Sequence, residues 1–173
     1  GASMAAAEGE AFLYGIQHAI ENQNPFLCIS AGGGMRMMES LISLSQMTRT
    51  TVAINELKKN NLPYLVCITD PTAGGITASY AMLGDVHLAE PDALIAFAGA
   101  RVIQGTVKEE LPEGFQKSEY VEKTGFVDLI VERKDLSQKI GTLLSILLKK
   151  NSVISTEDNE TTEDTQSLSK VAS

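Results

Sequence analysis

Two apolar runs that each end in a glycine turn constrain the fold of this chain more than any other feature. Residues 26–30 lead into three glycines at 32–34, and residues 64–69 lead into Gly74 and Gly75. A helical pattern follows each turn. Continuous apolar runs that alternate with helices are typical of a parallel sheet covered by helices. The sequence therefore predicts an α/β fold in which both turns lie at the carboxyl edge of one sheet, where such folds bind ligands.

The rest of the chain is predicted to add helices and strands around this pair. Apolar residues recur at helical spacing, and loops rich in Pro, Gly and Asn separate the stretches. The expected helices are residues 8–23, 36–59, 76–83, 102–107, 118–123 and 135–150, and the further strands are residues 86–89, 94–98 and 127–131. One side of the expected helix over residues 36–59 is lined by Met38, Leu41, Ile42 and Ser45. The apolar stripe of residues 135–150 consists of Leu136, Ile140, Leu143 and Leu147.

Length and charge narrow the class of protein. The 173 residues suffice for one domain with a real core, and the net charge of −8 argues against a nucleic-acid partner. No apolar run reaches the ~20 residues that cross a membrane. The first seven residues lack the charged start of a signal peptide and read as a chain entered mid-sequence. We expect one domain over residues 1–150 and a disordered acidic tail over residues 151–173.

Few side chains are placed to do chemistry. Cys28 and Cys67 lie inside the apolar runs without a CxxC motif, so we expect buried thiols, a reducing compartment and no metal site in this chain. His18 and His87 are interpreted as structural. Ser79 follows a glycine turn as the nucleophile of Clp-type proteases does, but no histidine stands where a triad requires it, near residues 98–100.

What remains is backbone chemistry at the glycine turns. Glycines let the backbone take positive φ and approach a ligand closely, and the N–H groups of such a turn converge on one spot. An oxyanion that develops there is stabilised strongly. The alternative is that the glycines serve only to make tight turns.

Six ordered blocks then give the chain a family resemblance. From about residue 2 to residue 150 it resembles the carboxyltransferase β subunit of the multi-subunit, bacterial-type acetyl-coenzyme A carboxylase. The blocks are SAGGGMRM (30–37), TDPTAGG (69–75), AMLGD (81–85), AEP (89–91), IAFAGARVI (95–103) and LPEGFQ (111–116).

The resemblance implies a crotonase-like fold of repeated ββα units and a reaction. Carboxybiotin gives its carboxyl group to acetyl-CoA, which becomes malonyl-CoA in the first committed step of fatty-acid synthesis. In the family's chemistry carboxybiotin releases CO2, the biotin enolate takes a proton from the acetyl methyl group, and the acetyl enolate attacks CO2. The implied oxyanion donors are the backbone amides of Gly33 and Gly34. The implied substrate-binding positions are Gly74, Gly75, Arg36 and Gly99.

The resemblance also implies partners and a location. The family's active site lies between β and a separate α subunit, in a heterotetramer of two of each, served by a biotin carboxyl carrier protein and an ATP-dependent biotin carboxylase. The protein would be bacterial and cytoplasmic. The family's four-cysteine zinc ribbon is absent from this sequence, so we expect zinc only in a missing N-terminal part. Because the family's site also needs the α subunit, we expect no activity from the isolated chain.

Four positions depart from the family pattern, and rival functions stay open. Ala2 and Ala5 stand where the family has glycines. Gly32 stands where the family has Ser, and Met35 stands where it has Ala and is expected to narrow the pocket. The rivals are a carboxyltransferase or decarboxylase for another acyl-CoA, such as propionyl-CoA, and a non-catalytic fragment that binds acyl-CoA or scaffolds the α subunit.

Overall fold

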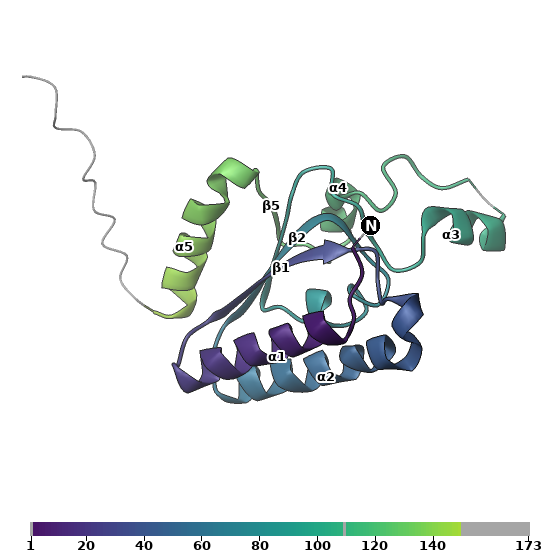
Figure 1. Cartoon of the computed structure of the whole chain (residues 1–173). Coiled ribbons are helices and arrows are strands. Elements are labelled where there is room, and N and C mark those ends of the chain that lie inside the picture. Colours follow the sequence, from purple (N-terminus) through teal and green to yellow (C-terminus); the bar gives the residue numbers. More distant parts are fainter. Residues whose placement is uncertain (1, 109, 150–173) are drawn as a thin grey trace, which may run out of the picture.

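The protein is a parallel β-sheet with helices on it, seen in a computed structural model that describes residues 2–108 and 110–149 (Figure 1). The sheet order is β1-β2-β3-β5, with β4 pairing to the far part of β2, and all these pairs are parallel. The strands are β1 (Phe26–Gly32), β2 (Tyr64–Ala73), β3 (Val86–Ala89), β4 (Ile95–Ala96) and β5 (Leu129–Ile130). The α-helices are α1 (Ala6–Glu21), α2 (Ser40–Lys59), α3 (Ala100–Val107), α4 (Ser118–Lys123) and α5 (Leu136–Leu147), and short 3-10 helices span Met37–Glu39, Tyr80–Met82 and Arg133–Asp135.

The main core lies between the sheet and the helix pair α1 and α2, which run side by side along one face (Figure 1). Alternate residues of β2 point into it, because successive side chains of a strand face opposite ways. Aromatic rings of Phe12, Phe26 and Tyr64 meet there with centroids 5.3 to 6.3 Å apart. This core holds the sheet whose carboxyl edge carries the two glycine turns, and the predicted α/β class is confirmed.

The stretch that follows the second glycine turn is not the α-helix that we expected over residues 76–83. It forms turns and then the 3-10 helix Tyr80–Met82. The Thr77 hydroxyl donates to the Gly74 carbonyl, and the Ser79 hydroxyl donates to the Gly75 carbonyl at 2.6 Å. Because these hydroxyls occupy the carbonyls of the first turn, they offer the backbone an alternative to the α-helix.

The expectation that the apolar side of residues 36–59 is buried is wrong. The first half of α2 buries its polar side and exposes its apolar side. Ser43, Gln46 and Thr50 are buried, whereas Met38, Leu41 and Ile42 are exposed. The helix becomes conventional only near its end, where Ile54 and Leu57 enter the core. The polar side packs on α1 at Gly9, where a Cβ would overlap the Gln46 side chain, so any larger residue at this position would force Gln46 to move.

Other surfaces are less covered than the sequence predicts. The apolar stripe of α5 is only half-buried, and no residue of that helix is fully buried. On β1, Leu27 and Ile29 face solvent while Cys28 and Ser30 turn toward the helices. Both cysteines are free thiols. Within the described residues no helix has both the length and the apolarity to cross a membrane.

Candidate active site

A bulge between β1 and β2 sets the position of both glycine turns. Ser30 pairs with Ile68, but Gly32 pairs with Thr72, so β2 uses extra residues there. The hydroxyls of Thr69 and Thr72 both donate to the Ser30 carbonyl, at 2.8 and 3.0 Å. Because these hydroxyls bind the carbonyl that the ladder leaves open, the two turns leave the sheet in a fixed relation.

The structure brings the two predicted turns into direct backbone contact. A Cβ at Gly74 would lie 3.0 Å from the Gly33 carbonyl oxygen and 3.1 Å from the Gly34 Cα. Gly34 has φ +132° and Gly74 has φ +62°, conformations that favour glycine. A side chain at Gly74 would have to move the other turn. This glycine is therefore required by the contact as well as by its own conformation.

Two of the four glycine amides in the turns donate a hydrogen bond within the described chain, and two do not. The Gly33 N–H donates to the Ala2 carbonyl at 2.9 Å, and the Gly74 N–H donates to the carbonyls of Ala96 and Phe97. The N–H groups of Gly34 and Gly75 donate no hydrogen bond to any residue of the described chain. Gly34 is buried. Backbone N–H groups without a partner are rare in buried residues, so the Gly34 amide is suited to an external acceptor. Gly75 is only partly buried and adds a second unengaged amide.

A short N-terminal segment, which the sequence patterns did not predict, closes one side of the first turn. The Met4 N–H donates to the Gly34 carbonyl at 2.9 Å, and the Arg36 N–H donates to the Met4 carbonyl at 2.7 Å. This segment, residues 2–5, therefore lies alongside the turn like a short strand. Isolated backbone pairing of this kind has no apolar period to reveal it in the sequence.

Arg36, a predicted substrate-binding residue, fastens that segment to the protein. Its guanidinium donates to the hydroxyl and the carbonyl of Ser3 at 3.1 and 3.0 Å. It also forms ion pairs with Glu8 and Glu39, at 3.1 and 3.0 Å. The two carboxylates in turn accept the N–H groups of Ala5 and Ala6 at the start of α1. The guanidinium is thus engaged within the protein, beside the first turn.

Of the other positions singled out in the sequence, Met35 and Ser79 touch the second turn, and Gly99 does not. Met35 packs against the second turn, since its Cγ would be 2.7 Å from a Cβ at Gly75. Gly99 precedes α3, and a Cβ added there would meet no atom within 4 Å, so it stands apart from the contacting turns. Ser79 donates its hydroxyl to the Gly75 carbonyl, an arrangement that gives no activated nucleophile.

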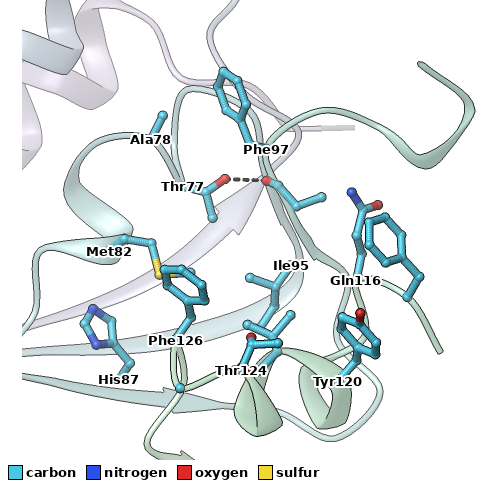
Figure 2. A pocket seen from close by; sticks show the side chains of 14 residues that line it. Thr77, Ala78, Met82, His87, Ile95, Phe97, Gln116, Tyr120, Thr124 and Phe126 are labelled. Atoms are coloured by element: carbon cyan, nitrogen blue, oxygen red, sulfur yellow. Dashed lines mark hydrogen bonds between the residues drawn. The ribbon is translucent and has the colours of Figure 1, made fainter. Parts of the chain in front are cut away.

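A largely apolar cavity of about 540 Å³ adjoins the second turn. Figure 2 shows Thr77 and Met82 on one side of it and Gln116 and Tyr120 on the other. The Thr77 hydroxyl donates to the Ala96 carbonyl, which also accepts the Gly74 N–H, so the cavity wall and the turn share one acceptor.

His87 lines the far part of this cavity and is held in its neutral form. Its Nε2 accepts the Gly84 N–H at 3.2 Å, and its Nδ1 lies 3.6 Å from an Asp128 carboxylate oxygen. Burial lowers the pKa of His87, and the nearby Asp128 charge opposes that shift only in part. An imidazole that accepts a backbone N–H on one nitrogen serves the structure at this position.

Comparison with known proteins gives the family and the fold. The sequence profile described as the carboxyl transferase domain matches residues 1–171. The acetyl-coenzyme A carboxylase carboxyl transferase subunit beta of Pelagibacter ubique is 82% identical over all of this chain and 56% of its own length. The protein of the same name from Hirschia baltica is 53% identical over 86% of this chain and 43% of its own. The chain thus spans about half the length of these curated relatives.

Solved structures agree on the architecture. Transcarboxylase 12S superposes with a TM-score of 0.73 at 23% identity, over 83% of this chain and 28% of that one. A chain of the Pseudomonas malonate decarboxylase hetero-dimer superposes with a TM-score of 0.70 at 21% identity, over 85% of this chain and 65% of that one. At such identities the likeness concerns the fold alone, which is the predicted crotonase-like fold. The profile match covers nearly every residue, and we conclude that this chain belongs to the carboxyl transferase domain family.

Proposed function

We propose that this chain supplies one half of the site in which a carboxyl group passes from carboxybiotin to acetyl-CoA, to form malonyl-CoA for fatty-acid synthesis. The observation that carries the proposal is the unengaged N–H of Gly34, a buried residue, next to the unengaged N–H of Gly75 on a contacting turn. Two fixed backbone donors on a glycine-lined surface suit an enolate oxygen. The family membership and the names of the relatives support the same reaction.

Each turn residue then has a role. Gly34 and Gly75 donate to the developing oxyanion, and Gly74 keeps the turns in contact. The Gly33 amide, predicted as a second donor, becomes available only when the Ala2 carbonyl moves away from it. Arg36 holds residues 2–5 against the turn and so fixes the position of the Gly34 carbonyl, through Met4.

The residues present fit a reaction whose base comes from outside this chain. The turns carry backbone donors, and the hydroxyls of Thr69, Thr72 and Ser79 that lie beside them are committed to carbonyls. Carboxybiotin would supply both the CO2 and, after its release, the base that takes the acetyl proton. This chain's part is to bind the thioester carbonyl, to orient it, and to lower the free energy of the enolate by donating two hydrogen bonds.

The remaining parts of the enzyme complete the proposal. A carboxyltransferase α subunit would close the site, a biotin carboxyl carrier protein and biotin carboxylase would serve it, and the complex would be cytoplasmic. Zinc would belong to a ribbon outside this sequence. Met35, packed on Gly75, favours a small acyl group such as acetyl.

The test is malonyl-CoA decarboxylation, which forms the same enolate without carboxybiotin. This chain, completed to the relatives' length with the flanking sequence of the Pelagibacter ubique protein, would be assayed with and without that organism's α subunit. We expect turnover only with both subunits, and slower turnover of methylmalonyl-CoA. Faster turnover of methylmalonyl-CoA would mean that the substrate is a larger acyl-CoA than acetyl-CoA. If neither compound is turned over, the chain is a non-catalytic scaffold.

A further inference from the structure

One buried side chain, that of Thr77, ties the second glycine turn to β4. Its hydroxyl oxygen lies 3.1 Å from the Gly74 carbonyl oxygen and within hydrogen-bond distance of the carbonyl oxygen of Ala96, the last residue of β4 (Figure 2). A threonine hydroxyl carries one hydrogen, so the two carbonyls share it. Thr77 is 7% exposed, and water therefore has little access to replace this hydrogen bond.

The Gly74 carbonyl and the Gly75 N–H belong to the same peptide group. A trans peptide is planar, and its C=O and N–H point in opposite directions. Whatever holds the carbonyl therefore sets the direction of the N–H. The Gly74 carbonyl faces the Thr77 hydroxyl and also accepts the Ala78 N–H at 3.0 Å. The N–H at the other side of this peptide, that of Gly75, is one of the two unengaged amides.

Within the described chain, no other side chain donates to this peptide group. The Ser79 hydroxyl donates to the Gly75 carbonyl, which belongs to the next peptide. In the first turn, the Gly33 carbonyl shares a peptide with the Gly34 N–H and accepts no hydrogen bond from the described residues. It lies against Gly74 instead, so the first turn also depends on the position of the second.

Loss of the Thr77 hydroxyl would leave two carbonyl oxygens close to each other in a buried place. Their partial negative charges repel when no hydrogen lies between them. The peptide can relieve this repulsion by rotating at Gly74, because glycine has the widest range of backbone conformations. Such a rotation turns the Gly75 N–H as well, and an oxyanion site depends on donors that are already aimed.

We propose that Thr77 is the positioning residue of the second oxyanion donor, because its hydroxyl, held between the Gly74 and Ala96 carbonyls, aims the Gly75 N–H. The inference rests on the function proposed above and deepens it, since it names the side chain on which a backbone donor depends. The alternative is that Thr77 only stabilises the fold, as any buried hydrogen-bonded hydroxyl does. The two roles differ in the direction of one N–H bond and in kcat.

The first measurement needs no activity, because N–H residual dipolar couplings report the direction of each N–H bond. The protein is this chain, completed with the Pelagibacter ubique flanks as above. Thr77→Val keeps the shape and removes the hydroxyl, whereas Thr77→Ser keeps the hydroxyl. The control is Thr50→Val, since Thr50 is fully buried and its hydroxyl donates to the Gln46 carbonyl within α2. We expect Thr77→Val to change the Gly75 coupling, and the other two variants to keep the wild-type value.

The second measurement is malonyl-CoA decarboxylation with the α subunit present. A hydrogen bond to the enolate is stronger in the transition state than in the bound substrate, so a misdirected donor lowers kcat and leaves KM nearly unchanged. A displaced donor costs less than a missing one, and we expect kcat of Thr77→Val to fall by at least about tenfold. Thr77→Ser and Thr50→Val should keep kcat within about threefold of the wild type. The loss of one hydrogen bond is small against the stability of a domain, so all variants should fold.

Each other outcome overturns a distinct statement. An unchanged Gly75 coupling in Thr77→Val overturns the positioning role, and so does a changed coupling with an unchanged kcat. A loss of kcat that Thr50→Val shares reduces Thr77 to a stabilising residue and also overturns it. If the wild-type complex does not decarboxylate malonyl-CoA, the proposed function fails, and the Gly75 coupling alone decides whether Thr77 aims this N–H.

Discussion

Replacing Gly74 by Ala tests whether the contact between the two glycine turns organises the site. The new Cβ would lie 3.0 Å from the Gly33 carbonyl oxygen and 3.1 Å from the Gly34 Cα. Both neighbours are backbone atoms, so no rotamer change relieves the overlap. The position also has φ +62°, a left-handed conformation that an L-residue adopts only at a cost.

Two contributions set the size of the effect. The left-handed conformation costs about 1–2 kcal/mol for Ala. Overpacking a closely packed contact costs about 1–3 kcal/mol. Together the free energy of unfolding should fall by roughly 2–5 kcal/mol, which lowers the melting temperature of a protein of this size by roughly 5–15 °C. If the fold survives by pushing the turns apart, a displacement approaching 1 Å at Gly34 should slow decarboxylation by about 100-fold.

The assay combines urea unfolding with malonyl-CoA decarboxylation in the completed enzyme. Gly99→Ala is the matched control, since a Cβ there has no neighbour within 4 Å and φ is −61°. That variant should unfold within about 1 kcal/mol of the wild type, because Ala is a poorer N-cap than Gly but meets no neighbour here. A Gly74→Ala protein as stable and as active as the control would refute the reasoning that the turns are locked by backbone contact.

Three further substitutions test other parts of the structure. Gly9→Ala should destabilise the fold by about 1–3 kcal/mol in urea unfolding, because its Cβ overlaps Gln46, whereas Gly105→Ala, which has no neighbour, should not. Burial holds the folded pKa of His87 below 6.5, so acidification below that value should lower wild-type stability, and His87→Gln should lose this part of the pH dependence; an unchanged slope would contradict the neutral imidazole. Arg36→Ala should release residues 2–5, seen as faster amide exchange at Met4, at a cost of about 1 kcal/mol because the guanidinium is partly exposed; unchanged exchange would mean that the segment is held otherwise.

The architecture and the meeting of the turns were predictable from sequence. Apolar runs without alternation indicate strands buried on both faces, which holds for β2 but not for β1, where Leu27 and Ile29 are exposed. The glycines at the ends of the runs mark the carboxyl edge. Parallel strands then bring Gly34 and Gly74 together by topology alone. The six sequence blocks add the family, which periodicity could never supply.

Sequence periodicity could not predict that the first half of α2 buries its polar side. Periodicity finds the apolar side of a helix but assumes that this side is the buried one. Here the choice is made by Gly9, which lets α1 approach the polar side at Gln46. The apolar side is left exposed in the described chain, and only the tertiary contact reveals this. The engagement of the Gly33 amide by Ala2 was hidden for a similar reason, because a backbone hydrogen bond leaves no side-chain signature.

The central claim is that a backbone N–H at Gly34 stabilises the enolate, and removing that one hydrogen tests it most directly. Semisynthesis can place glycolic acid at position 34, which replaces the N–H by an ester oxygen and keeps the chain shape. The same replacement at position 33 is the control, because that amide donates to Ala2. In the completed enzyme with its α subunit, malonyl-CoA decarboxylation should fall by about 10²–10³-fold for the ester at 34, and by less than about tenfold for the ester at 33, the size of one ordinary hydrogen bond. Equal rates for the wild type and the ester at 34 would contradict the account.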